Sequence, residues 1–181
     1  HRYHKNPGIF ATDAENIRKR LTQFPSLTHL PLIISEWGID SGNNPINSTN
    51  TAAAFSVNTV KEMQNSAFLL FNFEVKDGPP PLGGKWGLMT HEKDVSPLAV
   101  KPRYSAFDAL NSLSGNRITL LGEGTHVKAL AAQGDNKISV VVSNYDLGGK
   151  NSENVPRMTL LYWAREWTPM DANAGQAKIL V

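Results

Sequence analysis

Two carboxylates each follow an apolar run, and their types and positions suggest acid–base chemistry. Glu36 comes after the run LIIS, and Glu74 comes after AFLLFNF. Apolar runs without polar alternation are typical of strands buried on both faces of a parallel sheet. In a βα-barrel, the carboxyl ends of such strands open onto the catalytic face. Hydrolysis of a glycosidic bond uses two carboxylates, one as nucleophile or base and one as proton donor.

The residues around Glu36 and Glu74 leave alternatives open. Trp37 either stacks on a sugar ring or packs behind the strand, because aromatic residues at strand ends serve both purposes. Gly38 permits a sharp turn of the chain. Glu74 is a candidate second carboxylate, since carboxylates on adjacent strands can approach the ~5 Å that retaining glycosidases need. Strand alternation can instead point Glu74 outward.

Two other patterns resemble a metal site and a phosphate-binding loop, but neither is complete. His1 and His4 have the spacing of a metal pair, but the chain has only five histidines and no cysteine, so no metal site is expected. Gly83, Gly84 and Lys85 resemble part of a phosphate loop. They lack its full spacing, and Trp86 stands where serine or threonine belongs.

The elements that position these residues alternate in the first part of the chain. Helices are expected over residues 12–24, 51–64 and 102–113, with the apolar runs between them as strands. Thr12 and Glu15 have capping-box spacing. The inward helix faces are expected to be Ile17, Leu21 and Phe24, then Ala53, Val57 and Val60, then Ala106, Leu110 and Leu113. This order is typical of a βα-barrel or a doubly wound sheet. A doubly wound domain without sugar chemistry would carry a glycine-rich first turn, which the sequence lacks.

The pattern changes after residue 113. Strands are expected over 117–122, 126–132 and 137–145, separated by glycine-containing turns and no helix. The segment 156–167 is a candidate further strand, and residues 168–181 are not assigned. We therefore expect an α/β domain over 1–113 and an antiparallel β domain over 114–181.

Composition narrows the class of protein. The chain has 181 residues, 40% hydrophobic and 19% charged, so a packed core is expected. The net charge of +2 comes without a dense basic run, which argues against nucleic acid as a partner. No apolar run approaches the ~20 residues of a membrane span. The absence of cysteine fits either redox compartment, and an extracellular or periplasmic location is expected over a cytoplasmic one.

An ordered series of motifs resembles glycoside hydrolase family 39, whose members include β-xylosidases and α-L-iduronidases. The series covers roughly residues 1–145. It comprises HRYH at the end of a strand, SEWG and FNFEVKDG after the two apolar runs, KWGLMT, KPRYSAFDALNSLSGNRI, and ALAAQGDNKISVVVSNYD. The resemblance implies the last βα units of a (β/α)8 TIM barrel over 1–113, followed by an antiparallel β-sandwich over 114–181 that is complete or partial.

The resemblance also implies a function and a set of site residues. Glu36 would be the catalytic nucleophile of a retaining glycoside hydrolase acting on a carbohydrate substrate, with no cofactor. His1 and Tyr3 would orient the nucleophile and the sugar. The implied substrate contacts are completed by Trp37, Phe73, Glu74 and Asp77.

One departure from the family concerns the proton donor. Relatives carry it in an Asn-Glu-Pro motif, which this sequence lacks, and a whole barrel needs about 250 residues. A truncated enzyme is therefore expected, whose open sheet edges a second copy of the chain would cover. The alternative is a non-catalytic carbohydrate-binding or self-assembling β module.

Overall fold

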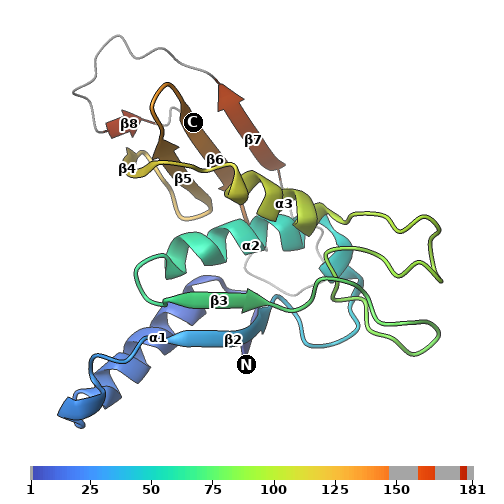
Figure 1. Ribbon diagram of the computed structural model, residues 1–181, viewed down its shortest axis with the longest axis horizontal. Coiled ribbons are helices and arrows are strands. Elements are labelled where there is room, and N and C mark those ends of the chain that lie inside the picture. Colours follow the sequence, from blue (N-terminus) through green and yellow to red (C-terminus); the bar gives the residue numbers. More distant parts are fainter. Residues whose placement is uncertain (1, 147–158, 166–175, 179–181) are drawn as a thin grey trace.

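Three parallel strands and three helices make up the first half of the structure. It is a computed structural model that describes residues 2–146, 159–165 and 176–178 (Figure 1). The strands lie in the order β1-β2-β3, and α1 and α2 connect them in turn. Their bounds are β1 (Arg2–Tyr3), α1 (Gly8–Leu21), β2 (Ile33–Gly38), α2 (Asn50–Met63), β3 (Leu69–Asn72) and α3 (Pro102–Asn111), with short 3-10 turns at Pro25–Leu27 and Pro45–Ser48. The alternation expected from the sequence is confirmed.

The second half is a five-stranded sheet in the order β7-β6-β5-β4-β8. Its strands are β4 (Asn116–Leu121), β5 (Val127–Gln133), β6 (Ile138–Asn144), β7 (Thr159–Arg165) and β8 (Gln176–Lys178). The first four are antiparallel neighbours, whereas β8 runs parallel to β4. The antiparallel region predicted after residue 113 is therefore confirmed, and β7 lies in the segment expected as a candidate strand. The sequence did not predict β8.

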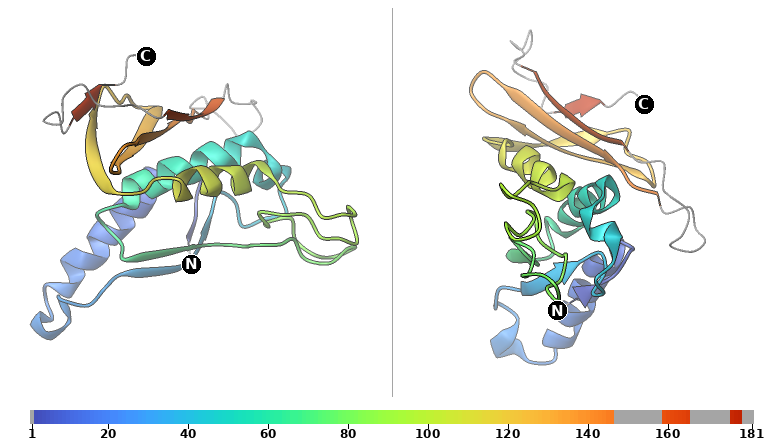
Figure 2. Two further views of the ribbon diagram at one scale, coloured as in Figure 1. Left: turned by 45° about the horizontal axis from the view of Figure 1, so that its top comes forward. Right: turned by 90° about the vertical axis from the view of Figure 1, so that its right-hand side faces the viewer.

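Helices α2 and α3 form a layer between the two sheets, as the turned views in Figure 2 show. One side of α2 packs with α3 and the antiparallel sheet, through small and branched residues that allow close approach. This cluster comprises Ala53, Val57, Ala106, Ala109, Leu130 and Val141. The other side of α2 faces the parallel sheet and α1. As a result α2 is buried along almost its whole length.

An aromatic cluster fills the core between the parallel sheet and its helices. Trp37 has no exposed surface and lies 5.9 Å from Phe10, 6.1 Å from Phe55 and 6.4 Å from Phe107, measured between ring centroids. Aromatic rings at such separations contribute about 0.5–1.5 kcal/mol per pair beyond the area they bury. The core therefore holds β2 against α1, α2 and α3.

Helix α1 differs from its prediction. It begins at Gly8 rather than near Thr12, and the Thr12 hydroxyl donates to the Gly8 carbonyl oxygen inside the helix at 3.2 Å, so the predicted capping box is wrong. Ile17 was expected to face inward but is 43% exposed, whereas Phe10 and Ala14 are buried. The amino-terminal half of α1 meets the core, and the rest extends past it (Figure 1). For α2 and α3, the predicted inward faces are confirmed.

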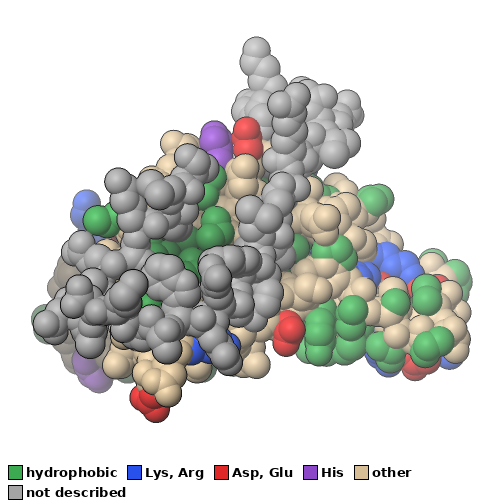
Figure 3. Space-filling view, turned by 90° about the horizontal axis from the view of Figure 1, so that it is seen from above, with side chains coloured by type: hydrophobic (Ala, Val, Ile, Leu, Met, Phe, Trp, Pro, Cys, Tyr) green, Lys and Arg blue, Asp and Glu red, His purple; other side chains and the backbone are tan. Residues whose placement is uncertain are grey.

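The parallel sheet has one covered and one open face. Ile33, Leu69 and Phe71 are 41–54% exposed, whereas Ile34 and Leu70 pack on the core. Burial on both faces, which the apolar runs predicted, is therefore wrong for these strands, because helices cover one side only. The loop between β3 and α3 also presents apolar side chains, visible at the right of Figure 3. No helix in the described part of the chain is long and apolar enough to cross a membrane.

Candidate active site

The site is built where the three parallel strands end. Tyr3, the last residue of β1, pairs with Gly38 at the end of β2. Its phenol hydroxyl donates a hydrogen bond to Oε1 of Glu36, 33 positions further along the chain. Because parallel strands bring their carboxyl ends to one edge, residues distant in sequence meet there. The predicted meeting of Tyr3 and Glu36 at this edge is observed.

Local backbone geometry orients Glu36. The pairing of β2 with β3 shifts register between Ile34 and Trp37, and Glu36 lies inside that irregularity. Bulges of this kind re-aim side chains. Trp37 consequently enters the core, while Glu36 is half-buried at the edge of the sheet beside Tyr3.

Gly38 makes room for the tyrosine ring. A Cβ atom at this position would lie 3.0 Å from Cε1 and 3.1 Å from Cδ1 of Tyr3, closer than ordinary van der Waals contact. The glycine after Glu36 and Trp37, which is the last residue of β2, therefore serves the close approach of Tyr3.

Electrostatics keep the Tyr3 phenol a donor. Burial, and next the hydrogen bond to Glu36, raises the pKa of Tyr3 above its ordinary value. The phenol is therefore protonated at neutral pH and donates to the carboxylate. Burial, and next the negative charge of Asp77, raises the pKa of Glu74, and the positive charge of Arg103 opposes that rise. Glu74 thus belongs to the same electrostatic environment as Glu36.

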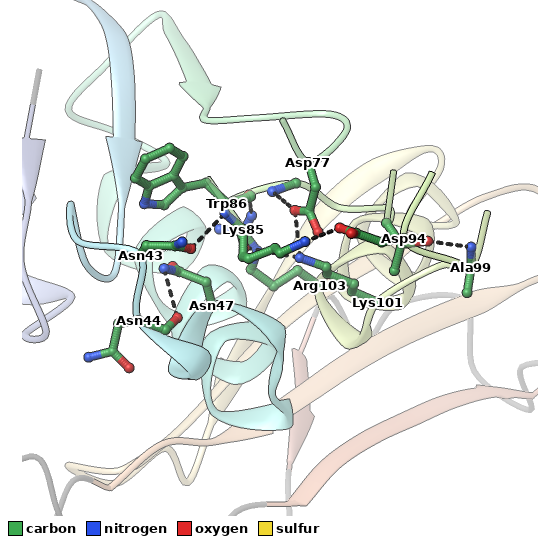
Figure 4. A network of polar contacts seen from close by, with 12 residues as sticks. Asn43, Asn44, Asn47, Asp77, Lys85, Trp86, Asp94, Ala99, Lys101 and Arg103 are labelled. Carbon is green, nitrogen blue, oxygen red and sulfur yellow. Dashed lines mark hydrogen bonds and ion pairs between the residues drawn. The ribbon is translucent and has the colours of Figure 1, made fainter. Parts of the chain in front are cut away.

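A buried ionic network underlies this edge (Figure 4). Nζ of Lys101 lies 2.6 Å from Oδ1 of Asp77, and the two residues are only 5% and 3% exposed. Asp77 also accepts from the Gly87 backbone N–H at 2.8 Å. The Arg103 guanidinium, 1% exposed, donates to the Trp86 carbonyl oxygen. Burial lowers the pKa of Arg103 to about 10, which still leaves it charged at neutral pH.

Two aromatic residues, Phe73 and Trp86, lie in the segment that follows β3. Phe73 follows β3, and its backbone N–H donates to the Trp37 carbonyl oxygen at 3.1 Å. Its ring lies 5.9 Å from the indole of Trp86, between centroids. Both side chains are half-buried. Phe73 is therefore at the edge of the sheet where it was expected.

Two of the predicted substrate contacts need correction. Trp37 is enclosed by the aromatic core, so its alternative role as a packing residue is the one the structure supports. Asp77 is occupied by Lys101 and Gly87 and is buried, so it holds the loop together rather than facing a ligand. His1 lies outside the described residues.

The sequence indicated no site role for three residues of this region, Lys101, Arg103 and Trp86. Pro102 signalled the start of a helix, but nothing local indicated that its neighbours reach back to the loop after β3. Trp86 was noted as a mismatch to a phosphate loop and as part of the motif KWGLMT, without a role in the site. The described residues contain no group of three His, Cys, Asp or Glu side chains placed to hold a metal ion. A cavity of about 390 Å³ lies along α1 and the first part of β2, and neither Tyr3 nor Glu36 lines it.

Comparison with solved structures identifies the fold. A monomeric β-xylosidase from Caulobacter crescentus CB15 is 20% identical, with a TM-score of 0.66, over 80% of this chain and 29% of its own. A glycoside hydrolase family 39 enzyme from Xanthomonas axonopodis pv. citri is 22% identical, with a TM-score of 0.63. The match covers 77% of this chain and 27% of that enzyme. A glucosidase from Croceicoccus marinus is 20% identical, with a TM-score of 0.68. The match covers 80% of this chain and 32% of that enzyme.

The chain has a family 39-like fold. The resemblance found in the sequence motifs is thereby confirmed at the level of the fold, and identities of 20–22% show no more than that. The chain spans less than a third of the length of these relatives. No protein-family model and no curated protein matches the sequence.

Proposed function

We propose that this chain is the nucleophile-bearing part of a retaining glycoside hydrolase. In this proposal residues 1–113 are the last βα units of a (β/α)8 barrel and residues 114–181 belong to a β-sandwich domain. The observation that carries it is the hydrogen bond from Tyr3 to Glu36 at the carboxyl edge of a parallel sheet. The solved glycosidases of similar fold support it.

In the proposed mechanism Glu36 attacks the anomeric carbon of the substrate sugar. The glycosidic bond breaks, the leaving oxygen takes its electron pair, and a covalent glycosyl ester forms on Glu36. Tyr3 holds the carboxylate in position, and its phenol keeps its own proton throughout. A general acid outside these 181 residues protonates the leaving oxygen, and then activates the water that releases the sugar.

The test removes the need for that acid. The purified chain is incubated with 2-deoxy-2-fluoro glycosides whose dinitrophenolate leaving group departs unprotonated, and the intact mass and peptide map are recorded. We expect one glycosyl adduct, on Glu36, and none in Glu36→Gln. Glu15→Gln is the matched control, since Glu15 is an exposed carboxylate on α1. Absence of an adduct with every sugar, or an adduct elsewhere, contradicts the proposal.

We also propose that a second copy of the chain covers the open edges of the parallel sheet and the open face beside them. Exposed Ile33, Leu69 and Phe71 support this, because exposed apolar sheet faces and unpaired edges favour association. Phe71→Lys is expected to lower the mass measured by analytical ultracentrifugation, whereas Leu82→Lys is not, since Leu82 is 94% exposed on a loop. A monomeric wild-type chain would contradict this part.

A further inference from the structure

Asn72, the last residue of β3, is a polar residue at the end of an apolar strand. Successive side chains of a strand point to opposite faces of its sheet. Leu69 and Phe71 are exposed on the open face, whereas Leu70 packs against the core. Asn72 therefore lies on the covered face with Leu70. The run AFLLFNF thus places a carboxamide where burial favours an apolar side chain.

The carboxamide of Asn72 binds the residue that directly follows Glu36. Its Nδ2 group donates to the Trp37 carbonyl oxygen at 3.2 Å. The same oxygen accepts from the Phe73 backbone N–H at 3.1 Å. Trp37 and Asn72 are also paired in the register of β2 and β3. Two donors from the end of β3, one from a side chain and one from the backbone, therefore hold the Trp37 peptide.

These two hydrogen bonds lie where the irregularity around Glu36 ends. Ile34 pairs with Leu70 and Trp37 pairs with Asn72, so three steps along β2 match two steps along β3. Such an extra residue interrupts the backbone ladder and changes the direction of nearby side chains. The Asn72 side chain adds a hydrogen bond at the point where pairing resumes. The direction of Glu36, one residue before Trp37, therefore depends on this contact.

The other end of the Asn72 carboxamide is unpaired. Its Oδ1 atom is buried and accepts no hydrogen bond from the part of the chain that the structure describes. Burying an unpaired carbonyl oxygen costs free energy, which an apolar side chain of similar size would avoid. Without Asn72 the Trp37 carbonyl oxygen would still accept from Phe73. Stability alone therefore does not account for an asparagine at this position.

We infer that Asn72 is a positioning residue, which holds the Trp37 peptide so that Glu36 lies at the edge of the sheet beside Tyr3. This inference rests on the proposed function, in which Glu36 is the nucleophile. Loss of the carboxamide should misplace Glu36 and slow its attack. Loss of the buried, unpaired oxygen should leave the fold at least as stable. A residue with a merely structural role would instead lose rate and stability together.

The first experiment compares Asn72→Leu with the wild-type chain. Saturation kinetics of adduct formation on Glu36 are measured with one dinitrophenyl 2-deoxy-2-fluoro glycoside. We expect the limiting rate to fall about 3- to 10-fold, as for the loss of one neutral hydrogen bond. The half-saturating concentration should stay within about twofold, because Asn72 does not contact the sugar. The midpoint of urea unfolding should equal or exceed that of wild type.

Two further variants accompany this comparison. Asn72→Gln keeps an amide donor on a longer side chain and should recover part of the rate. Asn111→Leu is the matched control, since Asn111 is exposed at the end of α3, and it should change neither kinetic constant. An unchanged limiting rate in Asn72→Leu would overturn the inference. A slower reaction accompanied by a lower urea midpoint would also overturn it, because Asn72 would then merely stabilise the sheet.

A second measurement does not depend on reaction. The NMR signal of Tyr3 Cζ, in protein labelled with 13C at this atom of tyrosine, reports the hydrogen bond from the phenol to Glu36. It is assigned by its loss in Tyr3→Phe. We expect Asn72→Leu to move the signal toward its position in Glu36→Gln, and an unmoved signal would overturn the inference. A moved signal, in a chain whose wild type forms no adduct, would support the inference and contradict the proposed function.

Discussion

At the scale of single residues, the site depends on an approach between Tyr3 and Glu36 that three neighbours permit. The register shift in β2 aims Glu36 at the edge, Trp37 anchors the strand in the core, and Gly38 leaves space for the tyrosine ring. A protonated phenol donating to a carboxylate is a charge-assisted hydrogen bond, among the stronger kinds.

Tyr3→Phe removes that hydrogen bond and keeps the ring. We expect the limiting rate of adduct formation on Glu36 to fall about 10- to 100-fold, because a hydrogen bond to a charged group contributes about 1.5–3 kcal/mol. The measurement is the rate of adduct formation as a function of the concentration of one dinitrophenyl 2-deoxy-2-fluoro glycoside. Tyr104→Phe is the control, since Tyr104 is 41% exposed on α3. Equal rates for Tyr3→Phe and wild type would show that Glu36 is oriented without the phenol.

Gly38→Ala tests the same contact from the other side. The new methyl group displaces the Tyr3 ring by a few tenths of an ångström, so we expect a smaller loss in limiting rate, about threefold to tenfold. Combined with Tyr3→Phe it should cost little more rate than Tyr3→Phe alone, because both act on one interaction. Gly124→Ala is the control, as nothing lies within 4 Å of a Cβ atom there. Additive losses would contradict the shared mechanism.

At the scale of elements, the loop between β3 and α3 is held by the buried pair Asp77 and Lys101. The pair joins the part of the loop after β3 that carries Asp77 to Lys101, which lies 24 residues later and directly precedes α3. Burial, opposed by Asp77, lowers the pKa of Lys101. Nζ of Lys101 also donates to the Lys85 carbonyl oxygen at 3.0 Å, so the pair fixes the part of the loop that carries Trp86.

Asp77→Asn and Lys101→Met should each destabilise the protein strongly. Each leaves one buried charge without its partner, which costs about 3 kcal/mol in the free energy of unfolding. The double variant should lose much less than the sum, since it removes both charges. Urea unfolding followed by circular dichroism measures the cycle. Strictly additive losses would mean that the two side chains do not interact energetically.

The elements that the sequence predicted correctly are those that leave a local signal in it. The strands at the apolar runs, the inward faces of α2 and α3, and the change of pattern after residue 113 are local signals, and each was predicted correctly. Burial of the parallel strands on both faces was not, because it depends on what covers the sheet. The inward face of α1 was not, because Ile17 has the right spacing but borders an open cavity beside β2 and is 43% exposed. The enclosure of Trp37 and the ion pair of Asp77 could not be predicted, because their partners, Phe55 and Lys101, come from distant segments. Glu36 and Tyr3 were paired through the motif resemblance, since spacing alone does not bring two strands together.

At the scale of the whole molecule, Tyr145 links the antiparallel sheet to the loop between β1 and α1. Its hydroxyl donates to the Lys5 carbonyl oxygen at 2.5 Å, across 140 positions of sequence. The side chain is 6% exposed, and its ring lies 5.6 Å from that of Phe55. Burial raises the pKa of Tyr145 above its ordinary value.

This shift predicts loss of stability in alkali. Above a pH of about 10 the unfolded tyrosine loses its proton while the folded one keeps it, so the unfolded state binds fewer protons and the free energy of unfolding falls as pH rises. Tyr145→Phe should flatten that fall by up to about 1.4 kcal/mol per pH unit. Urea unfolding between neutral pH and pH ~11 measures the slope, with Tyr104→Phe as control. A slope that Tyr145→Phe leaves unchanged would contradict the assignment.

The burial of α2 on both sides has a consequence for how the molecule comes apart. Ala53 and Val57 belong to the cluster shared with the antiparallel sheet, while Phe55 belongs to the cluster around Trp37. Separating α2 from either sheet would expose apolar side chains of both. The change of topology near residue 113 is therefore not a boundary at which one part unfolds alone. Heating should therefore disorder both sheets in one cooperative transition, and a protease should find few cleavage sites at that junction until the whole chain opens.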